Sequence, residues 1–179
     1  MHRLNCRQNQ KDLFKSFFMI TIGLRVYATS KIYYCLLEQH PGGIINYLDI
    51  SLLHIPSALL WPESLNFVRN TILDILLQYN VEQAAIRISE FGTTVNDTMT
   101  NRNYIEGVLQ ETLASSNVIK FVTGRIAEFT SLLGIQRTGF KDYIDGTTVF
   151  PNSPISPAWN SLSHEQRETI LVANAALNL

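Results

Sequence analysis

Apolar residues recur every three or four positions in three separate segments of this sequence, and this spacing constrains the fold more than any other feature. The clearest stripe lies in 63–80 and consists of Leu65, Val68, Ile72 and Tyr79. Residues with this spacing share one face of an α-helix, which such a stripe packs against a core. Similar stripes in 117–133 and 164–177 predict two further helices.

The ends of these segments carry helix signals. Gly134 follows the second stripe, where a glycine often ends a helix, and Ser163 with Gln166 has the spacing of a capping box before the third. A short β-type run over 147–150 stops at Pro151. We therefore predict a mainly α protein with a small β component: helices near 64–80, 117–133 and 164–177, and one strand around 147–150. Residues 30–61 fit neither period.

Composition excludes several classes of protein. The chain has 179 residues, 46% of them hydrophobic and 16% charged, so it is not a disordered chain. Its two cysteines cannot form a disulfide framework or a four-thiolate zinc site. The net charge of −1 shows no basic excess, so we expect no nucleic-acid partner. No apolar run reaches the about 18 residues of a membrane span, so we expect no transmembrane segment.

The N-terminus differs from the rest of the chain in charge. Residues 1–31 carry six basic side chains and one acid. A basic stretch up to Lys15 precedes an apolar run over 16–24, and small residues follow at 26–28. This order predicts a targeting leader over 1–28, with a mature N-terminus near residue 28 or 29. A secretory signal implies a secreted protein and a presequence implies a mitochondrial one, while an ordinary element of the fold is the remaining alternative.

No motif for catalysis or metal binding stands out. None of the four histidines has the i, i+4 spacing of a helical metal site, and H-E-x-x-H, G-x-S-x-G and glycine-rich phosphate loops are absent. We therefore expect a protein that is not an enzyme, with no catalytic residue, no metal and no cofactor.

One short motif resembles a cofactor site. His40-Pro41-Gly42-Gly43, preceded by Leu37-Glu38-Gln39, resembles the haem-ligand motif of cytochrome b5. The resemblance implies that His40 is an axial ligand. Such a haem needs a second histidine, and His54 lies too near while His164 lies too far along the chain. A proline–glycine turn is the simpler interpretation.

The C-terminal third resembles the first half of a fasciclin (FAS1) domain. The matching fragments are Glu111-Thr112-Leu113-Ala114, Phe121-Val122, Thr148-Val149-Phe150-Pro151, Ala158-Trp159 and Leu162-Ser163-His164-Glu165-Gln166. With the possible leader, this resemblance divides the chain into an apolar helical region of unknown family over 29–107 and a half-module over 108–179. The alternative is a single compact domain. If the resemblance holds, the fold is α+β.

The fasciclin resemblance implies a non-enzymatic adhesion protein with protein partners or self-association. The candidate contact residues are Pro151, Pro154, Pro157 and Trp159, because prolines hold a loop extended and tryptophan is frequent at binding hot spots. Asn96 begins the sequon Asn96-Asp97-Thr98 and is a glycosylation candidate if the chain is secreted. The alternative function is a structural or assembly subunit of a larger mitochondrial or viral complex.

Overall fold

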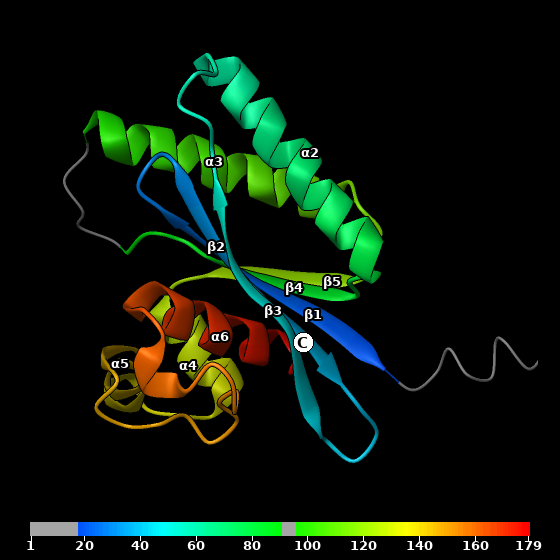
Figure 1. Cartoon of the computed structure of the whole chain (residues 1–179), viewed down its shortest axis with the longest axis vertical. Helices are drawn as coiled ribbons and strands as arrows, with labels where there is room; N and C mark the ends of the chain where they lie inside the picture. Colours follow the sequence, from blue (N-terminus) through cyan, green and yellow to red (C-terminus); the bar gives the residue numbers. More distant parts are fainter. Residues whose placement is uncertain (1–17, 91–95) are drawn as a thin grey trace, which may run out of the picture.

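A single mixed sheet forms the centre of the protein. The structure is a computed structural model, and it describes residues 18–90 and 96–179. The five strands lie in the order β3-β2-β1-β4-β5, with helices on both faces (Figure 1). The strands are β1 (Met19–Tyr27), β2 (Lys31–Gln39), β3 (Ile45–His54), β4 (Gln83–Arg87) and β5 (Lys120–Gly124).

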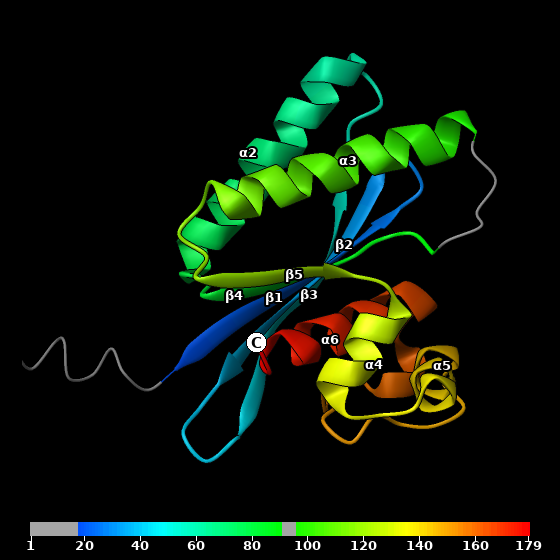
Figure 2. The same ribbon diagram turned by 180° about the vertical axis from the view of Figure 1, so that it is seen from behind.

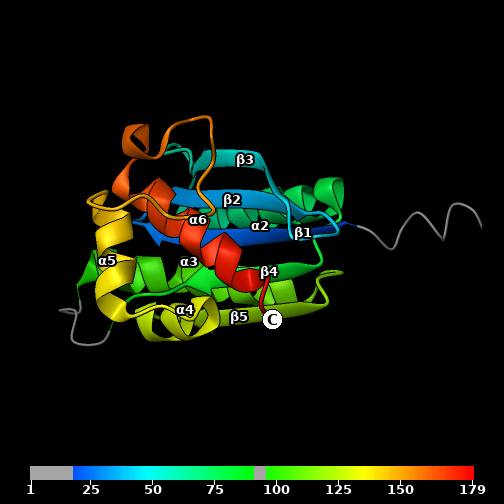
Figure 3. The same ribbon diagram turned by 90° about the horizontal axis from the view of Figure 1, so that it is seen from below.

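Two helical layers enclose this sheet. One face is covered by α2 (Trp61–Tyr79) and α3 (Asp97–Ala114). The other is covered by α6 (His164–Ala176), with α4 (Ile126–Leu133) and α5 (Arg137–Asp145) beside it (Figure 2). A short 3-10 turn, η1 (Trp159–Ser161), precedes α6. Figure 3 shows α6 lying along the middle of the sheet, over β1 and its neighbours.

The strand directions follow from the connections. β1, β2 and β3 are joined by short turns and pair antiparallel, whereas β4 and β5 each follow a helix and run parallel to β1. The strand β1 alternates between the two layers: Ile22 and Leu24 are buried on the α2–α3 side, and Thr21 faces α6, where its hydroxyl donates to the Ala173 carbonyl.

The mainly α fold class is wrong, because the protein is a mixed α/β structure. Residues 117–133 are not one helix: β5 ends at Gly124, Arg125 is extended, and α4 begins at Ile126. The 3.6-residue spacing there arises from a strand and a helix in succession. The described residues 147–150 are bends and irregular chain instead of a strand. The other two predicted helices correspond to α2 and α6, and the Ser163–Gln166 capping box is present.

Residues 30–61 fit no period because they contain the antiparallel strands β2 and β3 and the start of α2. A bulge between Leu36 and Leu37 shifts the register of β2 against β3 and breaks the alternation of side chains between the two faces.

The predicted leader overlaps the central strand. β1 pairs along its length with β2 and also with β4, so a cut near residue 28 would remove the strand on which the sheet is built. Residues 1–17 lie outside the described part of the chain. The leader and the localisation that depends on it stay predictions. Within the part of the chain that the structure describes, no helix has the length and apolar character needed to cross a membrane.

Cys35 gives a direct test of this packing. It lies in β2, is fully buried, and burial raises the pKa of its thiol well above the ordinary value. In a Cys6→Ser variant, we expect the remaining thiol to react with a disulfide reagent only as fast as the protein opens, and at once in denaturant. Rapid labelling of the folded variant, followed by absorbance, would contradict this position for β2.

Candidate functional site

The carboxyl ends of β1 and β4 form the best-placed candidate site. The chain continues from β1 to β2 on one side of it, while β4 lies on the other side. In open α/β sheets, ligands bind where neighbouring parallel strands diverge in this way, beyond their carboxyl ends. Arg25 of β1 and Arg87 of β4 are register partners there, so both side chains point to the α6 face.

Glu168 of α6 lies between these two arginines. Its Oε2 is 2.5 Å from Nη1 of Arg25, and its Oε1 is 2.9 Å from Nε of Arg87. The side chains are 2% exposed for Glu168, 5% for Arg87 and 13% for Arg25. We call Arg25, Arg87 and Glu168 the central triad. It joins the two strands to the helix that covers them.

Burial affects the arginines of the triad strongly. Loss of solvation lowers the pKa of Arg25, and the negative charge of Glu168 opposes that shift. A guanidinium nevertheless keeps its charge in a protein. The ion-pair distances are short, but the donor and acceptor groups are not well aligned for hydrogen bonds. Among the described residues, Nε of Arg25, Nε of Arg87 and Oε2 of Glu168 have no hydrogen-bond partner. All three charged groups of the triad therefore have hydrogen-bonding capacity that is not fully used.

A second carboxylate extends the site toward α4. Oε1 of Glu90 is 2.8 Å from Nη2 of Arg87 and accepts a hydrogen bond from the amide of Ile126 at 3.1 Å. Its Oε2 lies 3.8 Å from Nη2 of Arg137, whose side chain is 63% exposed. The free amides at a helix start attract negative charge, so the carboxylate of Glu90 is stabilised from three directions.

A third group adds charge from the far face of the sheet. Arg102 and Glu106 of α3 form an ion pair at 2.8 Å, and the Ser89 hydroxyl donates to the same Glu106 oxygen at 3.3 Å. Nε of Arg125 donates to the Ser89 carbonyl at 3.0 Å. We call all of these residues the arginine edge; its charged members are Arg25, Arg87, Arg102, Arg125, Arg137, Glu90, Glu106, Glu165 and Glu168.

Two tyrosines flank the arginine edge. Tyr33 of β2 is the register partner of Arg25, and its ring lies 6.2 Å from that of Tyr27 in an edge-to-face arrangement. Burial raises the pKa of Tyr33, and the charge of Glu165 adds to that shift. Tyr27 is 42% exposed. The pair therefore places an accessible aromatic surface next to the positive groups.

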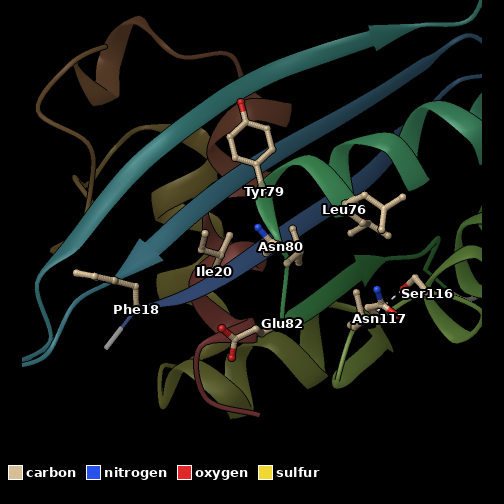
Figure 4. Close-up of a pocket in the computed structure, with 11 residues that line it drawn as sticks. Phe18, Ile20, Leu76, Tyr79, Asn80, Glu82, Ser116 and Asn117 are labelled. Atoms are coloured by element: carbon tan, nitrogen blue, oxygen red, sulfur yellow. Dashed lines mark hydrogen bonds between the residues drawn. The ribbon is translucent and has the colours of Figure 1, made fainter. Parts of the chain in front are cut away.

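A pocket lies at the opposite end of the sheet. Its volume is about 570 Å³, and it opens at the amino ends of β1 and β4 (Figure 4). The residues around it include Phe18, Ile20, Leu76, Tyr79, Asn80 and Glu82. Among the residues that the structure describes, Glu82 is its one carboxylate and no basic side chain lines it. This pocket offers little for acid–base or ionic chemistry, so we place the candidate site at the arginine edge.

The haem candidate His40 lies at the end of the β2–β3 hairpin. Its Nε2 is 2.8 Å from Oε2 of Glu38 and 2.7 Å from Nδ2 of Asn46, and Phe18 contacts the ring with centroids 4.5 Å apart. The ring nitrogen that a haem iron would need is therefore engaged by protein groups.

The other predicted site residues lie outside the central triad. Trp159 is buried at 3% exposure and donates from its indole to the Tyr143 carbonyl at 3.2 Å. Pro154 is buried, whereas Pro151 and Pro157 are exposed. Asn96 is exposed and caps α3, accepting from the Met99 amide at 2.8 Å. Whether any of them contacts a partner stays a prediction.

Sequence reasoning missed the arginine edge, although a signal for it exists. Arg25 lies between Leu24 and Val26, and Arg87 lies between Ile86 and Ile88. A charge within an apolar strand is rarely buried unless it is paired, so such an arginine marks a specific partner elsewhere in the chain.

Comparison with known proteins identifies the fold. No family model matches the sequence, and no curated protein matches it. Among solved structures, Thermus thermophilus RuvC in complex with a Holliday junction substrate is similar, with a TM-score of 0.63 at 10% identity over 89% of this chain and 94% of that chain. A second structure of T. thermophilus RuvC gives the same score and coverage at 11% identity. The yeast mitochondrial Holliday junction resolvase Ydc2 has a TM-score of 0.57 at 15% identity, covering 88% of this chain and 77% of that chain.

These similarities overturn the fasciclin resemblance. The fold is RuvC-like, and the fragments that resemble a fasciclin half-module are spread over α3, β5, η1 and α6 of one sheet-centred domain. The expectation of a non-enzymatic adhesion protein is contradicted, because the neighbours in structure are junction resolvases. The expectation of no nucleic-acid partner is contradicted by the same likeness. A net charge of −1 concealed the concentration of arginines at one edge.

Proposed function

We propose that this protein binds and acts on branched DNA of the four-way junction type, with the arginine edge toward the DNA backbone. The observation that carries the proposal is the likeness, over 89% of the chain, to T. thermophilus RuvC in complex with a Holliday junction substrate. The identity of 10% is too low to carry over individual residues, so the assignment of the DNA-facing edge depends on the chemistry described above.

The chemistry of the arginine edge suits a nucleic-acid backbone. Phosphate oxygens receive most protein–DNA hydrogen bonds, and arginine binds them with two parallel donors. Five arginines gather at this edge, in a chain of net charge −1. Tyr27 adds an exposed ring on which an unpaired base at a branch point could stack.

Cleavage of the junction is the second candidate, favoured by the likeness to the yeast mitochondrial Holliday junction resolvase. Many nucleases use divalent metal ions held by several carboxylates. The described residues do not fit such ions: both oxygens of Glu168 face guanidinium groups, and the Glu90 carboxylate faces Arg87 and Arg137. We therefore derive no metal-dependent step here.

Binding of a labelled four-way junction, compared with a linear duplex of the same length, tests the proposal. We expect the junction to bind at least about tenfold more tightly, measured by fluorescence anisotropy at a fixed salt concentration. Arg137→Ala removes an exposed cation of the arginine edge, so we expect it to weaken binding and to lower the salt slope by about 1.

The matched control is Arg69→Ala. Arg69 is a half-exposed arginine of α2, paired with Glu111 at 3.0 Å on the α2–α3 layer. We expect its loss to leave junction binding unchanged. Equal affinity for junction and duplex would refute the proposed function, and an equal effect of the two variants would refute the assignment of the arginine edge.

A further inference from the structure

We infer that the central triad of Arg25, Arg87 and Glu168 excludes divalent metal ions, so this edge binds DNA without a bound metal ion. The inference rests on the proposed function for its ligand. Its structural part, the exclusion of metal ions from the central triad, stands on the geometry of the triad alone.

The supply of ligands is the first argument. Magnesium and manganese prefer oxygen ligands and need at least one or two carboxylates whose oxygens are free to coordinate them, beside waters and substrate phosphates. Within 18–90 and 96–179, no three histidine, cysteine or acidic side chains converge in a way that could hold a metal ion. The one carboxylate between β1, β4 and α6 is Glu168, and each of its oxygens already lies within 3 Å of an arginine nitrogen.

The sign of the charge is the second argument. A cation entering the triad would lie beside two permanent positive charges, in a region where side chains are 2–13% exposed and screening by water is weak. The carboxylates of Glu168 and Glu90 already pair with these guanidiniums, so neither is free to attract the cation.

The position of the positive charge is the third argument. Arg25 is the most exposed member of the triad, and its Nε has no hydrogen-bond partner among the described residues. Arginine clamps stabilise negative charge on phosphoryl groups as metal ions do, and they need no coordination shell. The Nε–H of Arg25 is therefore a donor that a phosphate oxygen can use and a metal ion cannot.

Titration of the full chain with manganese tests the inference directly. We expect calorimetry and electron paramagnetic resonance to find no stoichiometric manganese at the triad. The double variant Arg25→Asp/Arg87→Glu places three carboxylates together and is expected to gain a stoichiometric site, with circular dichroism as the check of folding. A native chain that binds manganese and loses it in Glu168→Gln, or in the milder Glu90→Gln, overturns the inference. Manganese that binds equally to all these single variants lies elsewhere and leaves the triad metal-free, as inferred.

The junction assay separates this inference from the proposed function. We expect the native chain to bind the four-way junction in the presence of a chelator, with an affinity within about twofold of that measured with magnesium at equal ionic strength. Junction cleavage that requires magnesium or manganese and disappears in Glu90→Gln would overturn the inference. A chain that binds no junction in either buffer refutes the proposed function, while the manganese titration still decides whether the triad excludes metal.

Discussion

Glu168→Gln is expected to lower the free energy of unfolding by about 3–5 kcal/mol, because it leaves the buried guanidinium of Arg25 without its counter-ion and that of Arg87 with Glu90 alone. The change keeps the size and shape of the side chain, so loss of packing contributes little. Urea unfolding followed by circular dichroism measures the difference. The effect should appear as a lower midpoint with an unchanged slope, since the folded state keeps its surface.

The control for this variant is Glu111→Gln. Glu111 pairs with Arg69 at 3.0 Å, but the two side chains are 55% and 38% exposed, so the pair is solvated. We expect its loss to change the free energy of unfolding by about 0–1 kcal/mol. Equal effects of the two variants would show that the central triad is hydrated in solution and is not the buried network described here.

A variant in which apolar residues replace the whole triad tests whether its charges contribute to the free energy of unfolding. A buried ion triad often contributes no more stability than apolar residues of similar size, because desolvation of the charges offsets their attraction. We therefore expect Arg25→Met/Arg87→Met/Glu168→Leu to unfold at a denaturant concentration near that of the native chain. A stability that does not require the charges would agree with the proposed binding role of this edge.

The sequence predicts the elements that pack by one face and misses those that depend on distant partners. α2 and α6 each carry their own apolar stripe, and the capping box at Ser163 is local, so both are visible in a short window. β1 is different: its apolar run follows a basic stretch and has the length of a signal-peptide core, so only its pairing with β2 and β4 shows it to be a strand.

The same limit applies to the candidate site. Each arginine of the central triad is visible as a charge within an apolar run, but the register that sets Arg25 opposite Arg87 is a property of the folded sheet. Glu168 follows a capping box on an amphipathic helix, where an acid is ordinarily solvated. Its role arises only because α6 crosses the sheet at this point. The short distance between α6 and β1 depends on Gly23 of β1.

Gly23→Ala is expected to destabilise the protein by about 3 kcal/mol or more, since overpacking at a backbone contact has no flexible side chain to absorb it. Gly23 lies in β1 under α6, and an added Cβ would meet the Ala173 nitrogen at 2.4 Å and the Thr169 oxygen at 2.6 Å. For a chain of this length, the loss corresponds to a fall in Tm of about 6–12 °C, measured by calorimetry. Moving α6 away would also separate Glu168 from both arginines.

Gly139→Ala and Gly107→Ala are the matched controls for this change. Both glycines lie within helices, in α5 and α3, and an added Cβ at either meets no atom within 4 Å. Each control should therefore raise stability by up to about 1 kcal/mol, because alanine favours the helix more than glycine does. If Gly23→Ala melts with the native chain, α6 does not pack against β1 at this distance, and the central triad loses the contact that assembles it.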